Sequence, residues 1–307
     1  MFDTFEHRQI ETSGASIHLV KQGTGFPLLL LHGYPETHVM WHRIAARLAE
    51  QFTVVAPDLR GYGDSSKPDS GPDHAPYSKR AMAQDLVEIL DHLGYQECFV
   101  VGHDRGGRVG HRMALDHPHC VKKLAVLDIA PTYTMYMRTD KAFATAYYHW
   151  FFLIQPSDLP ERLIGSQPEY YLRRCLASWS ADPTAFTPEA VAEYLRCFSN
   201  PATIHATCED YRAAATIDLQ HDEADLERKV TCPVLVLWGE RGVVGRTYDV
   251  VETWRERANE VSGKALPGGH FLPEEAPEQT YEALLEFLAP GAMPQGKRDE
   301  GETPVIE

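Results

Sequence analysis

Short apolar runs alternate along the chain with segments in which apolar residues recur at helical spacing. Such alternation is typical of a sheet built largely from parallel strands, because each parallel connection needs a crossover helix. The apolar runs predict strands at 16–20, 27–31, 52–56, 98–102, 124–129 and 233–239. Helical periodicity predicts intervening helices at 41–50, 78–93, 105–117 and 273–288.

Residues 132–215 break this alternation, since they combine many aromatic residues with helical periodicity and contain no run that predicts a strand. We therefore predict a helical cap at 132–215, inserted into one α/β core made of residues 1–131 and 216–290. Residues 291–307 are polar and aperiodic and contain proline and glycine, which predicts a disordered tail.

Composition excludes several classes of partner. Among 307 residues, 29 Lys and Arg face 44 Asp and Glu, and the net charge of −15 argues against nucleic acid and anionic membranes. No apolar run approaches the roughly 20 residues that span a bilayer. The six cysteines are scattered without a CxxC pair, which favours reduced thiols in a cytoplasmic protein. A small anionic ligand stays compatible with this charge if the site itself is positive.

One strand-to-helix turn carries candidate chemistry. Residues 102–106 read Gly-His-Asp-Arg-Gly directly after a predicted strand. This is the pattern of a nucleophile elbow, with Asp104 where serine is commonly found. Taken alone, the motif would also fit an ordinary turn whose aspartate caps the next helix.

Two further loops favour the catalytic interpretation. His-Gly-Tyr-Pro at 32–35 follows a predicted strand, where the backbone N–H of Tyr34 and that of Arg105 would form an oxyanion hole. Gly-Gly-His-Phe at 268–271 places His270 late in the chain, in the order expected of a base that follows its nucleophile.

Together these motifs resemble the α/β-hydrolase fold family over roughly residues 10–290. The resemblance implies a mostly parallel sheet flanked by helices and carrying an inserted helical cap. A carboxylate nucleophile suits displacement at sp³ carbon, which leaves an ester on Asp104 for water activated by His270 to hydrolyse. Two groups within the fold use this scheme, the dehalogenases and the soluble epoxide hydrolases.

The acid that orients His270 has two candidates. The loop 238–246, a common location for this acid, contains no aspartate and offers only Glu240, close to the end of a predicted strand. Asp128 instead ends the strand that follows the nucleophile helix. We assign the role to Asp128 and keep Glu240 as the alternative; a simple turn residue is the remaining interpretation of Asp128.

Arginines beside the nucleophile indicate the substrate. Arg105 follows Asp104 directly and Arg108 lies about one helical turn further along the same face. Two guanidinium groups there would keep Asp104 ionised and match the geometry of a substrate carboxylate. Arg112 continues the series, but Asp116 offers it a surface ion pair, so we leave it outside the site.

The Asp-Arg-Gly-Gly-Arg run at 104–108 resembles the haloacetate dehalogenase group, particularly the fluoroacetate dehalogenases. By this resemblance, His149, Trp150 and Tyr211 would form the halide site. Their ring N–H and O–H groups would give fluoride three donors without adding a mobile charge. Packing between cap and core is the alternative role for these aromatic residues.

The leading prediction is therefore hydrolysis of a haloacetate to glycolate and halide through an aspartyl ester, with no metal or organic cofactor. Family resemblance also implies a homodimer. The first alternative is an epoxide hydrolase, in which Tyr211 with Tyr147 or Tyr148 would protonate the opening oxygen. The second alternative is a catalytically silent protein that binds small molecules on the same fold.

Overall fold

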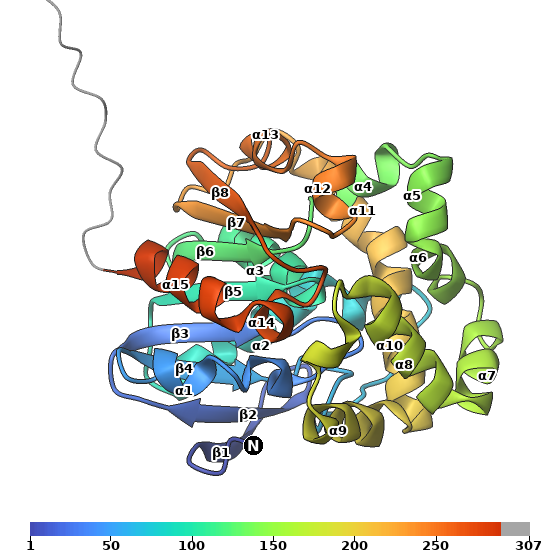
Figure 1. The fold of residues 1–307 in the computed structure, drawn as a ribbon, viewed down its shortest axis with the longest axis horizontal. Coiled ribbons are helices and arrows are strands. Elements are labelled where there is room, and N and C mark those ends of the chain that lie inside the picture. The colour runs from blue at the N-terminus through green and yellow to red at the C-terminus, as the bar shows by residue number, and fades with distance from the viewer. Residues whose placement is uncertain (290–307) are drawn as a thin grey trace, which may run out of the picture.

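An eight-stranded sheet forms the centre of the computed structural model, which describes residues 1–289 (Figure 1). Its strand order is β1-β2-β4-β3-β5-β6-β7-β8. The pairs β1–β2 and β2–β4 are antiparallel, and all later neighbours in this order are parallel, which confirms the predicted α/β architecture. The strands are β1 (Glu6–Glu11), β2 (Ser16–Gln22), β3 (Phe26–Leu31), β4 (Phe52–Pro57), β5 (Cys98–His103), β6 (Val121–Leu127), β7 (Val234–Gly239) and β8 (Val261–Leu266).

Burial explains which strands the apolar pattern could predict. Strand β4 is buried along its whole length and β3 is buried after its first residue. A parallel strand covered on both faces is apolar at nearly every position, so it reads as a continuous run. Strand β1 at the sheet edge has the sequence EHRQIE and buries only Ile10, so the pattern analysis did not predict it.

Helices cover the sheet and bring their N-termini to the carboxyl ends of the parallel strands. Helix α3 (Arg105–Asp116) contacts β3, β5 and β6, and α2 (Lys79–His92) packs against α3. Helix α13 (Val250–Arg255) contacts β7 and β8. The remaining short core helices are η1 (His38–Trp41), α1 (Ala45–Leu48), η2 (Ala75–Tyr77) and α12 (Val244–Thr247).

The predicted helix 273–288 is wrong as one element, because the structure divides it into α14 (Leu272–Glu275) and α15 (Pro277–Leu288). Ala276 between them has φ −136° and ψ 56°, outside the helical region. Proline disfavours helical geometry in the residue before it and lacks the N–H that would continue the helix. Pro277 therefore begins a new helix rather than extending the first.

Helices α4 to α11 lie together beyond the ends of the central strands (Figure 1). They continue through Ala224, so helical structure extends past the predicted cap boundary at 215. The domain limits themselves stay a prediction, and the predicted tail 291–307 lies outside the described residues. These helices are α4 (Thr132–Met137), α5 (Lys141–Ala146), α6 (Tyr148–Leu153), α7 (Leu159–Ser166), α8 (Pro168–Trp179), η3 (Pro183–Ala185), α9 (Pro188–Phe198), α10 (Pro201–Ala215) and α11 (Ile217–Ala224).

Two expectations from composition bear on this structure. Among residues 1–289, none of the helices has both the length and the apolar character that a membrane crossing requires. All six cysteines lie in the described part of the chain, where they are buried and free, as predicted.

Candidate active site

The turn from β5 into α3 presents Asp104 at the carboxyl end of the sheet. Asp104 has φ +42° and ψ −112°, a conformation that L residues rarely adopt. A side chain on Gly102 would lie 2.5 Å from the Gly106 carbonyl oxygen, so the sharp turn requires glycine there. The Asp104 side chain makes no capping hydrogen bond to α3. The capping role, the alternative from sequence, is therefore not the one that the structure gives this carboxylate.

Positive charge surrounds the buried Asp104 carboxylate. The backbone N–H of Tyr34 donates to Oδ2 at 3.2 Å, so the loop after β3 faces this carboxylate. Arg108 Nε lies 3.9 Å from Oδ1. Burial opposes ionisation of Asp104, but the charges of His270 and Arg108 outweigh burial and lower the pKa of Asp104. An ionised carboxylate is the form that a nucleophile needs.

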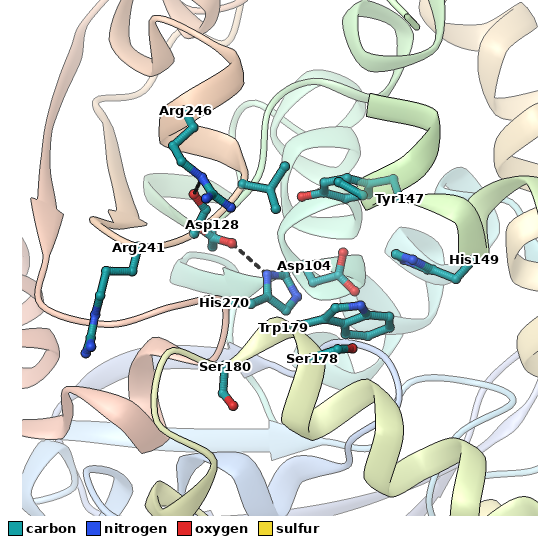
Figure 2. Close-up of a pocket in the computed structure, with 13 residues that line it drawn as sticks. Asp104, Asp128, Tyr147, His149, Ser178, Trp179, Ser180, Arg241, Arg246 and His270 are labelled. Atoms are coloured by element: carbon teal, nitrogen blue, oxygen red, sulfur yellow. Dashed lines mark hydrogen bonds and ion pairs between the residues drawn. The ribbon is translucent and has the colours of Figure 1, made fainter. Parts of the chain in front are cut away.

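His270 and Asp128 meet although 142 positions separate them in the chain (Figure 2). His270 Nδ1 lies 2.7 Å from Asp128 Oδ2, and the other oxygen of Asp128 accepts the Gly239 N–H at 3.0 Å. This arrangement directs a proton on Nδ1 at Asp128 and leaves Nε2 free for water. Burial lowers the pKa of His270, but the hydrogen bond to Asp128 outweighs it and raises the pKa above its ordinary value. The Glu240 side chain is exposed.

Both predicted carboxylate-binding arginines are buried, and each keeps one unpartnered nitrogen among the described residues. Arg108 donates from Nη1 to the Ala130 carbonyl at 3.0 Å and to Thr132 Oγ1 at 2.9 Å, and its Nε, 3.9 Å from Asp104 Oδ1, has no hydrogen-bond partner among the described residues. Arg105 is bound through Nε and Nη2, and its Nη1 has no partner. Buried N–H groups without partners are costly, so these two are candidates for donors to a bound anion.

The three residues predicted to bind halide lie next to one another. Tyr211 lies against His149 and Trp150, with ring centroids 5.9 Å and 6.4 Å away. His149 Nδ1 and Trp150 Nε1 are buried and have no partner in the part of the chain that is described. Burial lowers the pKa of His149 to about 3, so its imidazole is neutral at physiological pH. The structure thus brings these aromatic residues together, and their role in binding halide stays a prediction.

A cavity of about 80 Å³ opens beside Asp104 (Figure 2). His149, Trp179 and His270 line it, and Trp179 lies over His149 with ring centroids 4.3 Å apart. Two exposed arginines that sequence analysis did not single out also line it, Arg241 and Arg246. The remaining lining residues are Asp128, Ala146, Tyr147, Ser178, Ser180, Gly242 and Val243.

The predicted surface ion pair of Arg112 is wrong in its location. Arg112 is buried and binds three carboxylates: Asp116 at 3.3 Å, Asp222 at 2.7 Å and Asp225 at 2.6 Å. The last two lie on and just after α11, so Arg112 joins α3 to this element. Sequence could show the partner four residues away but not those more than a hundred positions distant.

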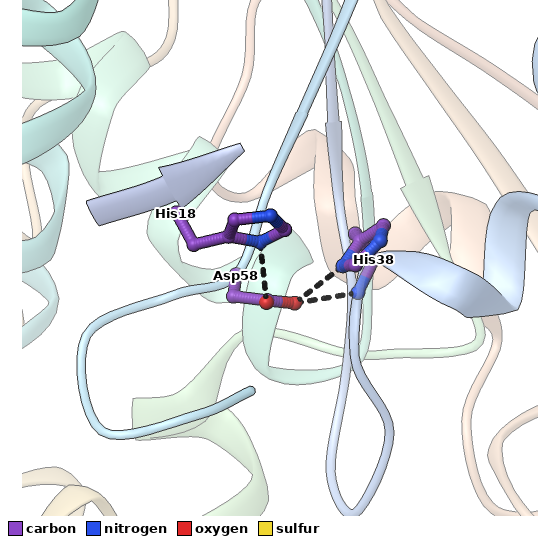
Figure 3. A group of neighbouring side chains, drawn as sticks. All are labelled: His18, His38 and Asp58. Atoms are coloured by element: carbon purple, nitrogen blue, oxygen red, sulfur yellow. Dashed lines mark hydrogen bonds and ion pairs between the residues drawn. The ribbon is translucent and has the colours of Figure 1, made fainter. Parts of the chain in front are cut away.

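One side-chain group has the composition of a metal site, His18, His38 and Asp58 (Figure 3). Its carboxylate already accepts from His18 Nδ1 at 3.0 Å and from His38 Nδ1 at 2.8 Å. The backbone N–H groups of His38 and Asp64 donate to the same carboxylate. Since both rings point their nitrogens at a saturated carboxylate, the geometry is that of a hydrogen-bonded network supporting the loop after β4.

A second group, Glu161, His205 and Glu209, is engaged in the same way. Arg212 donates to Glu161 at 2.7 Å and to Glu209 at 2.6 Å, and His205 lies 3.0 Å from Glu161. These carboxylates thus serve as counter-ions of a buried guanidinium. Nothing in either group points to a role at Asp104.

Besides Arg241 and Arg246, a further residue next to the site had no role predicted from the sequence. Asp210 directly precedes Tyr211 in the chain, but it received no role of its own. In the structure it is fully buried and binds Arg105. A charged residue in the middle of a helical segment gives no signal of such burial, because the partner that compensates it lies elsewhere in the chain.

Comparisons with known proteins agree with this geometry. The sequence matches the alpha/beta hydrolase fold family over residues 27–277. It is 48% identical to a fluoroacetate dehalogenase of Burkholderia sp, over 94% of this chain and 95% of the relative. It is 38% identical to a soluble epoxide hydrolase of Corynebacterium sp. (strain C12), over 92% of this chain and 97% of the relative. A crystal structure from Nostoc sp PCC 7120, described at the level of the alpha/beta hydrolase fold, has a TM-score of 0.93 and 69% identity, covering 94% and 99% of the two chains.

Proposed function

The chain belongs to the α/β-hydrolase fold family, and from this premise we propose that it hydrolyses the carbon–halogen bond of haloacetates, including fluoroacetate. One observation carries the proposal. Two buried arginines flank the Asp104 carboxylate, and each keeps an unpartnered nitrogen among the described residues, Nη1 of Arg105 and Nε of Arg108. A carboxylate group on the substrate would occupy both donors.

The first step is a displacement. Asp104 attacks the carbon that bears the halogen, a C–O bond forms, and the carbon–halogen bond breaks with its electron pair leaving on the halide. His149, Trp150 and Tyr211 would donate to the departing ion. The unpartnered, buried N–H-bearing rings of His149 and Trp150 support this role, since donors in a dry site stabilise developing negative charge strongly.

The second step regenerates the carboxylate. His270 takes a proton from water through Nε2 while Asp128 stabilises the resulting imidazolium, and the water oxygen attacks the carbonyl of the Asp104 ester. The backbone N–H of Tyr34, already 3.2 Å from Asp104 Oδ2, and that of Arg105 would stabilise the oxyanion. Glycolate leaves, and each turnover releases one halide ion and one proton.

The test is halide and glycolate release from fluoroacetate and chloroacetate. We expect both halides from the parent enzyme, and a loss of about 10⁴-fold or more in Asp104→Ala, because no other group can form the ester. Halide release by Asp104→Ala at the parent rate would contradict the mechanism. Binding of glycolate without turnover in the parent protein would instead support a silent binding protein.

Epoxide hydrolysis is the second candidate, because a soluble epoxide hydrolase is 38% identical to this chain and Tyr147 lines the cavity beside Asp104. Tyr147 and Tyr211 could protonate the opening oxygen of an epoxide. A neutral epoxide would leave the free donors of Arg105 and Arg108 without an anion, which favours haloacetate. Turnover of styrene oxide without release of halide from chloroacetate would reverse this order.

The predicted homodimer and cytoplasmic location belong to the same proposal, as does the expectation of no nucleic-acid or membrane partner. Sedimentation equilibrium of the full chain tests the dimer directly. A monomer across the concentration range would contradict it and leave the proposed chemistry untouched.

A further inference from the structure

The carboxylate of Asp210 binds one edge of the Arg105 guanidinium group. Asp210 is on α10, next to Tyr211, and is fully buried. Arg105 donates from Nε to Asp210 Oδ2 at 2.9 Å and from Nη2 to Oδ1 at 2.6 Å. Its Nη2 also donates to the Asp210 carbonyl oxygen at 3.0 Å. Two parallel bonds to a carboxylate define the plane of a guanidinium group, not only its position.

Asp210 is itself fixed by two more donors from the core. The Tyr62 hydroxyl donates to Asp210 Oδ2 at 2.6 Å, and the Lys79 ammonium donates to Oδ1. Tyr62 lies in the loop after β4 and Lys79 is the first residue of α2. The backbone N–H of Lys79 donates to Asp218 at 2.8 Å, which anchors that end of α2. The carboxylate thus accepts two hydrogen bonds on each oxygen, and donors from three separate core segments fix its direction.

This arrangement leaves Arg105 one free edge. With Nε and Nη2 bound to Asp210, only Nη1 lacks a partner in the described structure. The guanidinium carbon also lies 4.2 Å from the centre of the Tyr211 ring, so one face of the group is covered. Arg105 is completely buried, so leaving Nη1 without an acceptor is costly.

The charges make the role of Asp210 more specific than that of an anchor. Asp210 compensates Arg105, and without Lys79 the substrate would meet a guanidinium whose charge is largely cancelled. Burial raises the pKa of Asp210, but the charges of Arg105 and Lys79 outweigh it and bring that pKa well below its usual range. The charges of Arg105 and Lys79 thus favour the ionised form of Asp210.

We propose that Asp210 is a positioning residue that directs Nη1 of Arg105 at the anionic group of the substrate, with Tyr62 and Lys79 holding Asp210 in place. The network would thereby determine the preference for a carboxylate over a neutral group of the same size. This inference rests on the proposed haloacetate function and extends it to residues that do not contact the substrate.

The decisive variant is Asp210→Asn, assayed with chloroacetate and with neutral chloroacetamide. The substitution adds net positive charge near the site, so a field effect alone would lower KM for the anion. Loss of the orientation of Arg105 would instead raise this KM. We expect KM for chloroacetate to rise at least tenfold, with kcat/KM for chloroacetamide within about twofold of the parent value. An unchanged or lower KM for chloroacetate in a folded variant would overturn the proposal.

Removing a buried carboxylate can also unfold a protein, so a milder variant accompanies it. Tyr62→Phe deletes one hydrogen bond to Asp210 without changing charge, and we expect a threefold to tenfold rise in KM for chloroacetate alone. Glu209→Gln is the matched control, because Glu209 is a buried neighbour on α10 that holds Arg212 rather than Arg105. The proposal would also be overturned if Tyr62→Phe changed KM equally for the two substrates. A rise in KM for chloroacetate in Glu209→Gln as large as that in Tyr62→Phe would overturn it too.

Failure of the proposed function has a separate signature. If the parent enzyme releases no halide from chloroacetate or fluoroacetate, the haloacetate assignment falls. If the parent is active and the Asp210 and Tyr62 variants keep its KM for chloroacetate, only the positioning role falls.

Discussion

The buried carboxyl of Asp104 and the buried pair Glu36 and Glu274 have pKa values shifted in opposite directions. Asp104 faces His270 and Arg108, and its pKa is lowered despite burial. Glu36, in the loop after β3, and Glu274, in α14, face each other instead. Burial raises the pKa of both glutamates, and the charge of Glu274 raises the pKa of Glu36 further.

The difference shows that available cations, not burial, decide ionisation here. His103 lies between the two groups, with Nδ1 3.7 Å from Glu36 Oε2 and Nε2 2.8 Å from the His270 carbonyl oxygen. Burial lowers the pKa of His103 to about 3, so it is neutral and gives Glu36 no counter-ion. Arginine does not lose its charge in this way. The charges of His270 and Arg108 therefore favour the ionised form of Asp104, whereas burial and the charge of Glu274 favour the protonated form of Glu36.

The largest expected effect comes from replacing His270, the proposed base. His270→Asn should still allow Asp104 to displace halide, but water would then lack a base. We expect steady turnover to fall by about 10⁵-fold, with a burst of no more than one halide per active site. Mass spectrometry of the intact protein should find the carboxymethyl ester on Asp104. Asp104→Ala is the control, which should give neither burst nor ester; sustained turnover by His270→Asn would exclude this division of roles.

Asp128→Asn should have a smaller effect and a distinct pH dependence. The base must be neutral, so activity falls as pH drops through the pKa of His270, which Asp128 raises. Without the carboxylate that pKa falls, and the acidic limb of kcat should move to lower pH. We expect kcat at neutral pH to drop about 10³- to 10⁴-fold, because the imidazole also loses its orientation. An acidic limb that stays in place would show that another group sets it.

The residues around Asp104 could be predicted from the sequence, whereas the pair Glu36 and Glu274 could not. Asp104 and His270 lie in glycine-flanked turns whose order along the chain restricts their roles, and Asp128 follows a predictable buried strand. Those signals are local. The strands buried on both faces could be predicted for the same reason, whereas edge strand β1 presents polar residues and gives no such run.

Buried charge networks could not be predicted, because their members read one at a time as surface residues. Lys79 and Asp210 are 131 positions apart, and Arg112 and Asp225 are 113 apart. Each is costly to bury alone and acceptable only once the fold supplies its partner. Only the packing of the helices after β6 onto the core brings these partners together. The hydrophobic periodicity of the sequence does not predict that packing.

The smallest expected effect tests the carboxyl pair. Because the folded protein raises the pKa of Glu36, it holds a proton there that the unfolded chain releases near the usual glutamate pKa of about 4.3. The unfolded state then binds fewer protons, so this pair makes stability fall as pH rises above that value.

Glu36→Gln removes the titrating group. Relative to the parent, the variant should gain stability with increasing pH, by at most about 1.4 kcal/mol per pH unit. Urea unfolding at pH 5 and pH 8 measures this difference in stability, and Glu278→Gln at an exposed position is the control. If the difference in stability between Glu36→Gln and the parent were the same at both pH values, Glu36 would be ionised in the folded protein. The contrast with Asp104 would then be lost.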